Sequence, residues 1–211
     1  EIDLPAPKPL KGLTFAILKT VAMEHVLDLP KKAFINSIDK LEKAGARILE
    51  ISVSSVNEAM DLTRFLYSPE AYATWKHKIE KSPDLMFTQI LERFRSGANV
   101  LASDFICAWD KLIDLRQQYH LEVEAYDAVL IPTSPIVPPE ISRLMNNGDF
   151  YNSQNLLALR NTRIGNLMGG CSITLPTDIP SCGLLIMGRP NEEERLLRLA
   201  QACELVLARN Q

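Results

Sequence analysis

The order of apolar segments in the first fifty residues constrains the fold most. A mainly apolar run from Leu13 to Leu18 has the length of a buried strand, and apolar residues then recur at helical spacing from Phe34 to Leu41. Gly45 lies where this helix should end, and Arg47 to Val53 again has the pattern of a strand. Strand, helix and strand in this order are typical of a βαβ unit, so we predict an α/β fold with a mixed sheet flanked by helices.

The middle of the chain predicts a long helical region followed by one buried strand. Helical periodicity runs from about Val56 to Tyr126, with breaks expected at Ser82-Pro83 and Ser96-Gly97. We expect Ser103 or Asp104 to cap the last helix of this region. The compact apolar run from Asp127 to Ile131 then predicts a strand in the interior of the sheet.

The remaining residues alternate between helical and strand patterns. The elements expected there are a polar loop around Asn146-Asn147-Gly148, a helix from about Ser153 to Leu167, strands at Ser172 to Leu175 and Gly183 to Met187, and a final helix from Glu192 to Ala208. Apolar residues of that last helix fall on one face, so we expect it to dock on the sheet.

Composition and charge exclude several classes of protein. The chain has 211 residues, of which 46% are hydrophobic and 23% charged, which is typical of one globular domain rather than a disordered segment. The formal net charge of -3 gives no excess of positive charge for binding nucleic acid. No apolar run reaches the roughly 20 residues needed to span a membrane, and the N-terminal residues lack the pattern of a signal peptide, so we expect a cytoplasmic protein.

The residues that could hold a metal or act as a nucleophile are scattered. The four cysteines lie singly and His25, His77 and His120 are far apart in sequence, so we expect no metal site and no cofactor. A Gly-rich turn presents Cys171, which makes a thiol nucleophile one hypothesis. No histidine lies in the final third of the chain to activate that thiol, so a small packed residue is the favoured interpretation.

The turn that ends the predicted strand at Ile131 is a candidate pocket wall. It reads Pro132-Thr133-Ser134-Pro135, and open α/β sheets bind ligands beyond the carboxyl ends of their strands. Thr133 and Ser134 are therefore candidate substrate-binding residues. The alternative is turn chemistry alone, since Pro, Thr and Ser favour such turns without a ligand.

Four segments, taken in order, resemble the C-terminal half of the amidase signature family of amide hydrolases. They are Leu10 to Leu18 with the helix ending at Ala46, Gly97 to Pro135 including Tyr126-Asp127 and Pro132-Thr133, Thr162 to Pro176 including Asn166, and Gly183 to Gly188 with the closing helix. The resemblance implies that residues 1–211 are the C-terminal portion of an amidase-signature domain with a partial form of that fold.

The resemblance also implies a chemistry whose catalytic residues are not in this chain. The family uses a Ser, cis-Ser, Lys triad that precedes the matched part, so we expect no catalytic residue here, no activity of this chain alone, and an upstream catalytic half as partner. The implied substrate is a small-molecule amide. Arg93, four residues before Gly97, matches a substrate-contacting arginine of the tRNA amidotransferase branch, and a surface charge is its alternative.

Two further expectations follow from the resemblance. In the tRNA amidotransferase branch an aspartate binds the substrate amino group where this chain has Leu159-Arg160-Asn161, so glutamine is disfavoured as a source of ammonia. A different hypothesis is a non-catalytic binding or assembly module derived from the family. Such a module should be a well-behaved isolated domain. If the chain is instead half of a sheet protein, its outer strand would be open, which predicts a homo-oligomer or poor solubility of the isolated chain.

Overall fold

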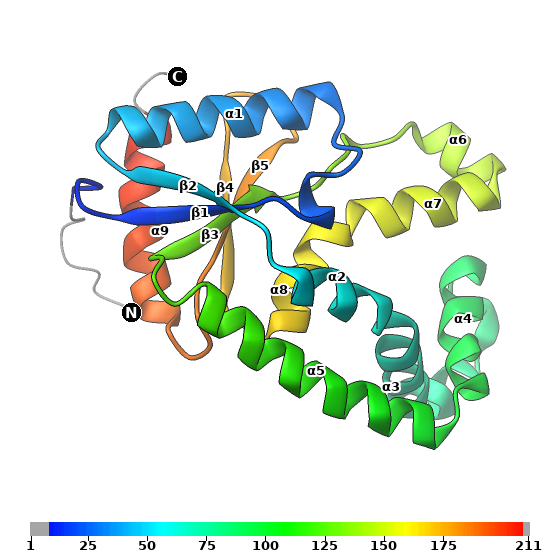
Figure 1. Ribbon diagram of the computed structural model, residues 1–211. Coiled ribbons are helices and arrows are strands. Elements are labelled where there is room, and N and C mark those ends of the chain that lie inside the picture. The colour runs from blue at the N-terminus through cyan, green and yellow to red at the C-terminus, as the bar shows by residue number, and fades with distance from the viewer. Residues whose placement is uncertain (1–8, 209–211) are drawn as a thin grey trace.

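A computed structural model describes residues 9–208, which form three layers with a β-sheet between two layers of helices (Figure 1). The strands are β1 (Thr14–Leu18), β2 (Arg47–Ile51), β3 (Ala128–Pro132), β4 (Ser172–Pro176) and β5 (Gly183–Met187). The α-helices are α1 (Asp28–Lys43), α2 (Ser54–Asp61), α3 (Thr63–Ile79), α4 (Thr88–Arg95), α5 (Ala102–Glu122), α6 (Ile141–Asn146), α7 (Gly148–Ala158), α8 (Arg160–Met168) and α9 (Glu193–Ala208). Short 3-10 helices are η1 (Val21–Met23), η2 (Pro83–Leu85) and η3 (Ser96–Asn99).

The sheet is mixed, with the strand order β2-β1-β3-β5-β4. β1 pairs with β2 and with β3 in parallel, whereas β5 runs antiparallel to both β3 and β4. The segment β1, α1 and β2 is the predicted βαβ unit, so the expected fold class is confirmed. β2 and β4 form the two edges of the described sheet.

Side chains of the central strands point alternately to the two faces of the sheet, and apolar side chains on both faces are covered by helices. In β1, Phe15 and Ile17 belong to the apolar cluster under α1 and α9, while Ala16 and Leu18 belong to the cluster under α2, α5 and α8. β3 and β5 divide their side chains between the same two clusters. Because successive side chains of a strand point to opposite faces, a strand buried on both faces must be apolar throughout, as β3 is.

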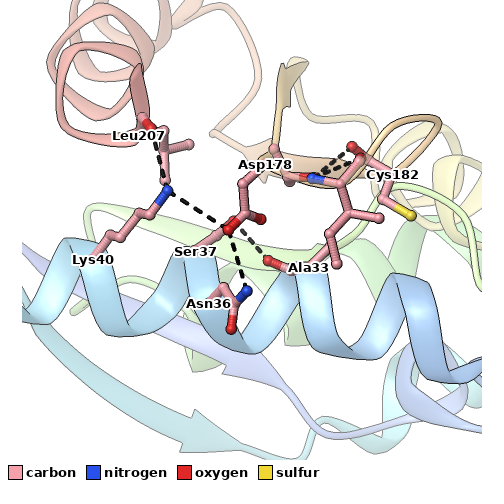
Figure 2. A network of polar contacts seen from close by, with 9 residues as sticks. Ala33, Asn36, Ser37, Lys40, Asp178, Cys182 and Leu207 are labelled. Carbon is pink, nitrogen blue, oxygen red and sulfur yellow. Dashed lines mark hydrogen bonds and ion pairs between the residues drawn. The ribbon is translucent and has the colours of Figure 1, made fainter. Parts of the chain in front are cut away.

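A polar network joins α1, the β4–β5 connection and the end of α9 (Figure 2). Lys40 Nζ lies 3.8 Å from the Asp178 carboxylate and 3.4 Å from the Leu207 carbonyl oxygen. Asn36 Nδ2 donates to the same carboxylate at 3.2 Å. The ammonium group of Lys40, a residue of α1, thus lies beside the C-terminal end of α9, where it is favourable because that end of a helix carries partial negative charge.

The helical region between β2 and β3 packs around one close backbone contact. α3 contains Pro69, and the backbone of η3 lies against α3 at this point. A Cβ on Gly97 would lie 2.1 Å from the Ser68 carbonyl oxygen and 2.6 Å from the Pro69 nitrogen. Only glycine therefore fits at position 97, which accounts for the predicted break at Ser96-Gly97.

Three details of the sequence-based assignment are wrong. α5 begins at Ala102 after Leu101 and has no side-chain cap, so neither Ser103 nor Asp104 acts as N-cap. The polar loop at Asn146-Asn147-Gly148 is a single-residue break between α6 and α7, because the Asn147 side chain accepts the Phe150 N–H and starts α7 at once. The single helix expected from Ser153 to Leu167 is divided at Leu159 into α7 and α8.

Within residues 9–208, no helix combines the length and the apolar character that crossing a membrane requires.

Candidate functional site

A groove of about 600 Å³ lies between α3 and α4 on one side and α7 and α8 on the other. Three helices each contribute one arginine to its lining, namely Arg64 from α3, Arg93 from α4 and Arg163 from α8. Tyr67 of α3 lies with them. The apolar part of the lining includes Ile90, Phe94, Leu156 and Leu159. A volume of this size is typical of small-molecule sites.

The charges in this groove are of one sign. Its lining contains three arginines and no aspartate or glutamate. None of the three forms a salt bridge with another residue in the described part of the chain, although neighbouring Arg95 is paired with Glu80 through two hydrogen bonds of 2.9 and 2.7 Å. The groove is therefore a local concentration of positive charge in a chain whose net charge is negative.

The guanidinium of Arg163 lies in an unfavourable environment. Burial is the main cause that lowers the pKa of its guanidinium, and the positive charge of Arg93 lowers it further. Its Nη2 atom is buried and has no hydrogen-bond partner among residues 9–208. An arginine stays protonated in proteins, so the Arg163 side chain remains a cation that is partly desolvated and repelled by Arg93.

Tyr67 responds to the same charges. Burial raises the pKa of its phenol, and the positive charges of Arg163 and Arg116 oppose that rise. The Tyr67 hydroxyl therefore stays protonated near neutral pH and can donate a hydrogen bond into the groove.

The two candidate residues of the strand-end turn lie at the carboxyl end of β3. Thr133 Oγ1 donates to Thr174 Oγ1 at 3.3 Å, and Ser134 Oγ accepts the Ile136 N–H at 3.3 Å. Both side chains are half-buried. The Thr133 bond joins the turn to β4 and the Ser134 bond closes the turn itself. Both bonds are of the kind expected for a turn that binds no ligand.

A buried amide holds this strand end in place. Asn161 is fully buried, and its Nδ2 donates to the carbonyl oxygens of Pro132 at 2.7 Å and Ala22 at 3.0 Å. Arg160 Nε donates to Asn161 Oδ1 at 3.1 Å, and Arg160 Nη2 donates to the Ala22 carbonyl oxygen. Arg160 and Asn161 thus connect α8, η1 and the end of β3 by bonding to each other and to the backbone carbonyls of Ala22 and Pro132.

Cys171 lies outside the groove. Its Sγ donates to the Arg189 carbonyl oxygen at 3.1 Å, and burial together with the charge of Glu193 raises the pKa of the thiol. A thiol nucleophile needs the opposite shift. The environment of Cys171 therefore favours the packed residue over the nucleophile.

Sequence reasoning found part of this arrangement. Arg93 lies in the groove, whereas Thr133 and Ser134 do not line it, so the three predicted substrate-binding residues are not brought together around that groove. Arg64, Tyr67 and Arg163 were missed. Arg163 lies three residues before Asn166 in the segment Thr162 to Pro176, yet a charge on a helix carries no signal of its own until the fold places it beside Arg93.

Comparison with known proteins places the chain in a family. The family model described as Amidase matches residues 1–197. The 2-amino-5-chloromuconic acid deaminase of Comamonas testosteroni is 26% identical over 97% of this chain and 46% of its own length. A glutamyl-tRNA(Gln) amidotransferase subunit of Fusobacterium nucleatum is 24% identical over 96% of this chain and 46% of its own length.

The fold agrees with this assignment. The allophanate hydrolase of Kluyveromyces lactis superposes with a TM-score of 0.79 at 19% identity, over 97% of this chain and 34% of the hydrolase. The chain spans about half the length of the curated relatives that it matches. A family model that covers nearly the whole sequence, together with this shared fold, shows that the chain belongs to the amidase family.

Proposed function

We propose that this chain is the C-terminal portion of an amide hydrolase and that it forms one wall of the substrate pocket. The observation that carries the proposal is the match of the Amidase family model to residues 1–197, while the relatives extend to about twice the matched length. The reaction is the hydrolysis of a carboxamide C–N bond to an acid and an amine or ammonia.

We assign the catalytic residues to an upstream part of the protein and the pocket wall to this chain. The serine nucleophile, the bridging serine and the lysine of the family belong to an upstream part, where they form and hydrolyse the acyl-enzyme. This chain supplies the five-stranded sheet and the groove that contains Arg93. Arg93 is the proposed substrate contact, and Thr133 and Ser134 are proposed to face the substrate once the upstream part covers the end of β3.

The proposal predicts that hydrolysis requires both parts. The test compares ammonia release from a set of simple amides by the 211-residue chain and by the longer reading frame that includes the upstream segment. We expect release by the longer protein only. Release by the 211-residue chain alone would overturn the proposed division. A longer frame without a lysine and a Gly/Ser-rich segment would instead favour a non-catalytic binding module.

A further inference from the structure

Helix α8 is attached to the rest of the chain at both of its ends. At its N-terminal end, the Asn161 amide donates to the carbonyl oxygens of Pro132 and Ala22. At its C-terminal end, side chains of α5 donate to carbonyl oxygens of α8 itself. The nine residues of α8 span roughly 13 Å along the helix axis, so these are two separate points of attachment.

Arg116 of α5 caps the C-terminal end of α8. Its Nε donates to the Leu167 carbonyl oxygen at 2.5 Å, and its Nη2 donates to the Asn166 carbonyl oxygen at 3.3 Å. His120 lies one turn further along α5, with its Nε2 3.0 Å from the Met168 carbonyl oxygen. The last carbonyls of a helix have no partner within the helix and carry partial negative charge, so a cation that donates to two of them is favourably placed.

The guanidinium of Arg116 is held by its other neighbours as well. Its Cζ lies 5.5 Å from the centre of the Trp109 ring, within the range of a cation–π contact. Gly169 ends α8 with a φ of +70°, and a Cβ at this position would lie 3.3 Å from Arg116 Cζ. Among residues 9–208, Arg116 forms no salt bridge. Its charged group therefore contacts the end of α8 and Trp109 rather than a carboxylate.

The opposite end of α8 fixes the turn that follows β3. Asn161 bonds to Pro132, the residue directly before Thr133 and Ser134, which are proposed to face the substrate. The apolar side chains of α8 are buried in the same cluster as side chains of β3 and α5, and α8 lies between α5 and the sheet (Figure 1). A short helix in a densely packed interior moves as a unit, so a shift at its C-terminal end also displaces its N-terminal end.

We propose that Arg116 is a positioning residue for amide hydrolysis. It holds α8 where the Asn161 amide can place the turn after β3 against the substrate, and it acts through α8 from the end opposite Asn161. This inference rests on the proposed function for the reaction and the substrate, but the hold of Arg116 on the turn can be measured without hydrolysis.

Hydrogen–deuterium exchange tests this hold on the protein expressed from the longer reading frame. Arg116→Met keeps an apolar stem but cannot donate to the carbonyls of α8. We expect it to speed exchange at least about tenfold in peptides that cover α8 and the turn after β3, and to leave α9 unchanged. Unchanged exchange in the turn would overturn the proposal.

A second variant keeps the test decisive if Arg116→Met does not fold. Arg116→Lys retains the positive charge but lacks the planar pair of donors that reaches two carbonyls. We expect exchange in α8 and in the turn to be at least about threefold faster than in the wild type, and slower than in Arg116→Met. Exchange in the turn at the wild-type rate in Arg116→Lys would overturn the proposal in that case.

Kinetics separate positioning from folding in the same variants. Titration with a fluorophosphonate counts the molecules whose proposed upstream serine still reacts. We expect Arg116→Met to keep this count and to lower kcat/KM for amides at least about tenfold, with partial recovery in Arg116→Lys. Loss of reactive molecules in proportion to activity would identify a merely structural residue and would overturn the proposal. Arg198→Met, an exposed control on α9 with the same substitution, should change neither quantity.

The proposed function fails in a different measurement. If the longer protein hydrolyses no amide but Arg116→Met speeds exchange in the turn, the hold of Arg116 on the turn stands and the amidase role falls. If amides are hydrolysed and Arg116→Met changes neither exchange in the turn nor kcat/KM, the amidase role stands and the positioning role falls.

Discussion

Replacing Asn161 by leucine should loosen the junction between α8, η1 and the end of β3. The amide of Asn161 is fully buried and makes three hydrogen bonds, to the carbonyl oxygens of Pro132 and Ala22 and from Arg160 Nε. Leucine has a similar volume, so the change removes polar contacts without leaving a large cavity. The Ala22 carbonyl oxygen keeps its bond from Arg160 Nη2, whereas the Pro132 carbonyl and Arg160 Nε lose these bonds to Asn161.

The expected magnitude follows from these lost bonds. Each buried polar group that loses its partner costs roughly 1–3 kcal/mol, and the apolar surface of leucine offsets part of that, which leaves a loss of about 2–4 kcal/mol in the free energy of unfolding. For a chain of this length that corresponds to a fall in melting temperature of roughly 5–15 °C. Urea and thermal unfolding followed by circular dichroism measure both quantities.

A matched control separates this effect from the general effect of an Asn to Leu change. Asn152 is exposed on α7, so Asn152→Leu should alter the free energy of unfolding by less than about 0.5 kcal/mol. If Asn161→Leu is no less stable than Asn152→Leu, the buried amide does not hold the strand end and our interpretation of the turn is wrong.

Four other predictions concern packing, titration, the thiol and assembly. Gly97→Ala should lower the free energy of unfolding by about 1–3 kcal/mol or more in urea titrations, because the new Cβ meets backbone atoms of Ser68 that cannot move aside; an unchanged midpoint would refute this. Burial lowers the pKa of His120 below 6.5, so the unfolded chain binds the proton more readily and the free energy of unfolding should fall as the pH drops below that value. His120→Gln should make the melting temperature less dependent on pH between about pH 7.5 and 5.5. An identical pH dependence in the variant would count against this prediction. Cys171→Ala should leave any amide hydrolysis of the full protein unchanged, and loss of hydrolysis with an unaltered melting temperature would revive the thiol hypothesis. Light scattering should show self-association of the isolated chain through an open edge of the sheet, and a monodisperse monomer at all concentrations would contradict it.

The layers of the fold were predictable because hydrophobic periodicity carries that information. Helices cover both faces of two central strands, so the side chains on both faces of these strands have to be apolar. This is the pattern of the sequence from Phe15 to Leu18 and from Ala128 to Ile131. Helix ends were harder to predict. The cap at Asn147 turns a polar cluster, which resembles a loop, into the start of a helix, and the break at Leu159 lies within a continuous helical pattern.

The groove was only partly predictable, for a physical reason. Arg93 entered through family resemblance, but Arg163 is 70 residues away in sequence and becomes its electrostatic neighbour only when α8 packs near α4. A charged residue on a helix is ordinarily a surface residue, and nothing local distinguishes one that is desolvated. Asn161 was equally hidden, since its partners are backbone carbonyls of distant segments.

We propose that the protein hydrolyses amides with a nucleophile outside these 211 residues. The most direct measurement treats the longer reading frame with a fluorophosphonate probe and locates the labelled residue by peptide mapping. We expect one labelled serine in the segment upstream of Glu1 and no label on the 211-residue chain alone. A labelled residue within the 211 residues would contradict the account.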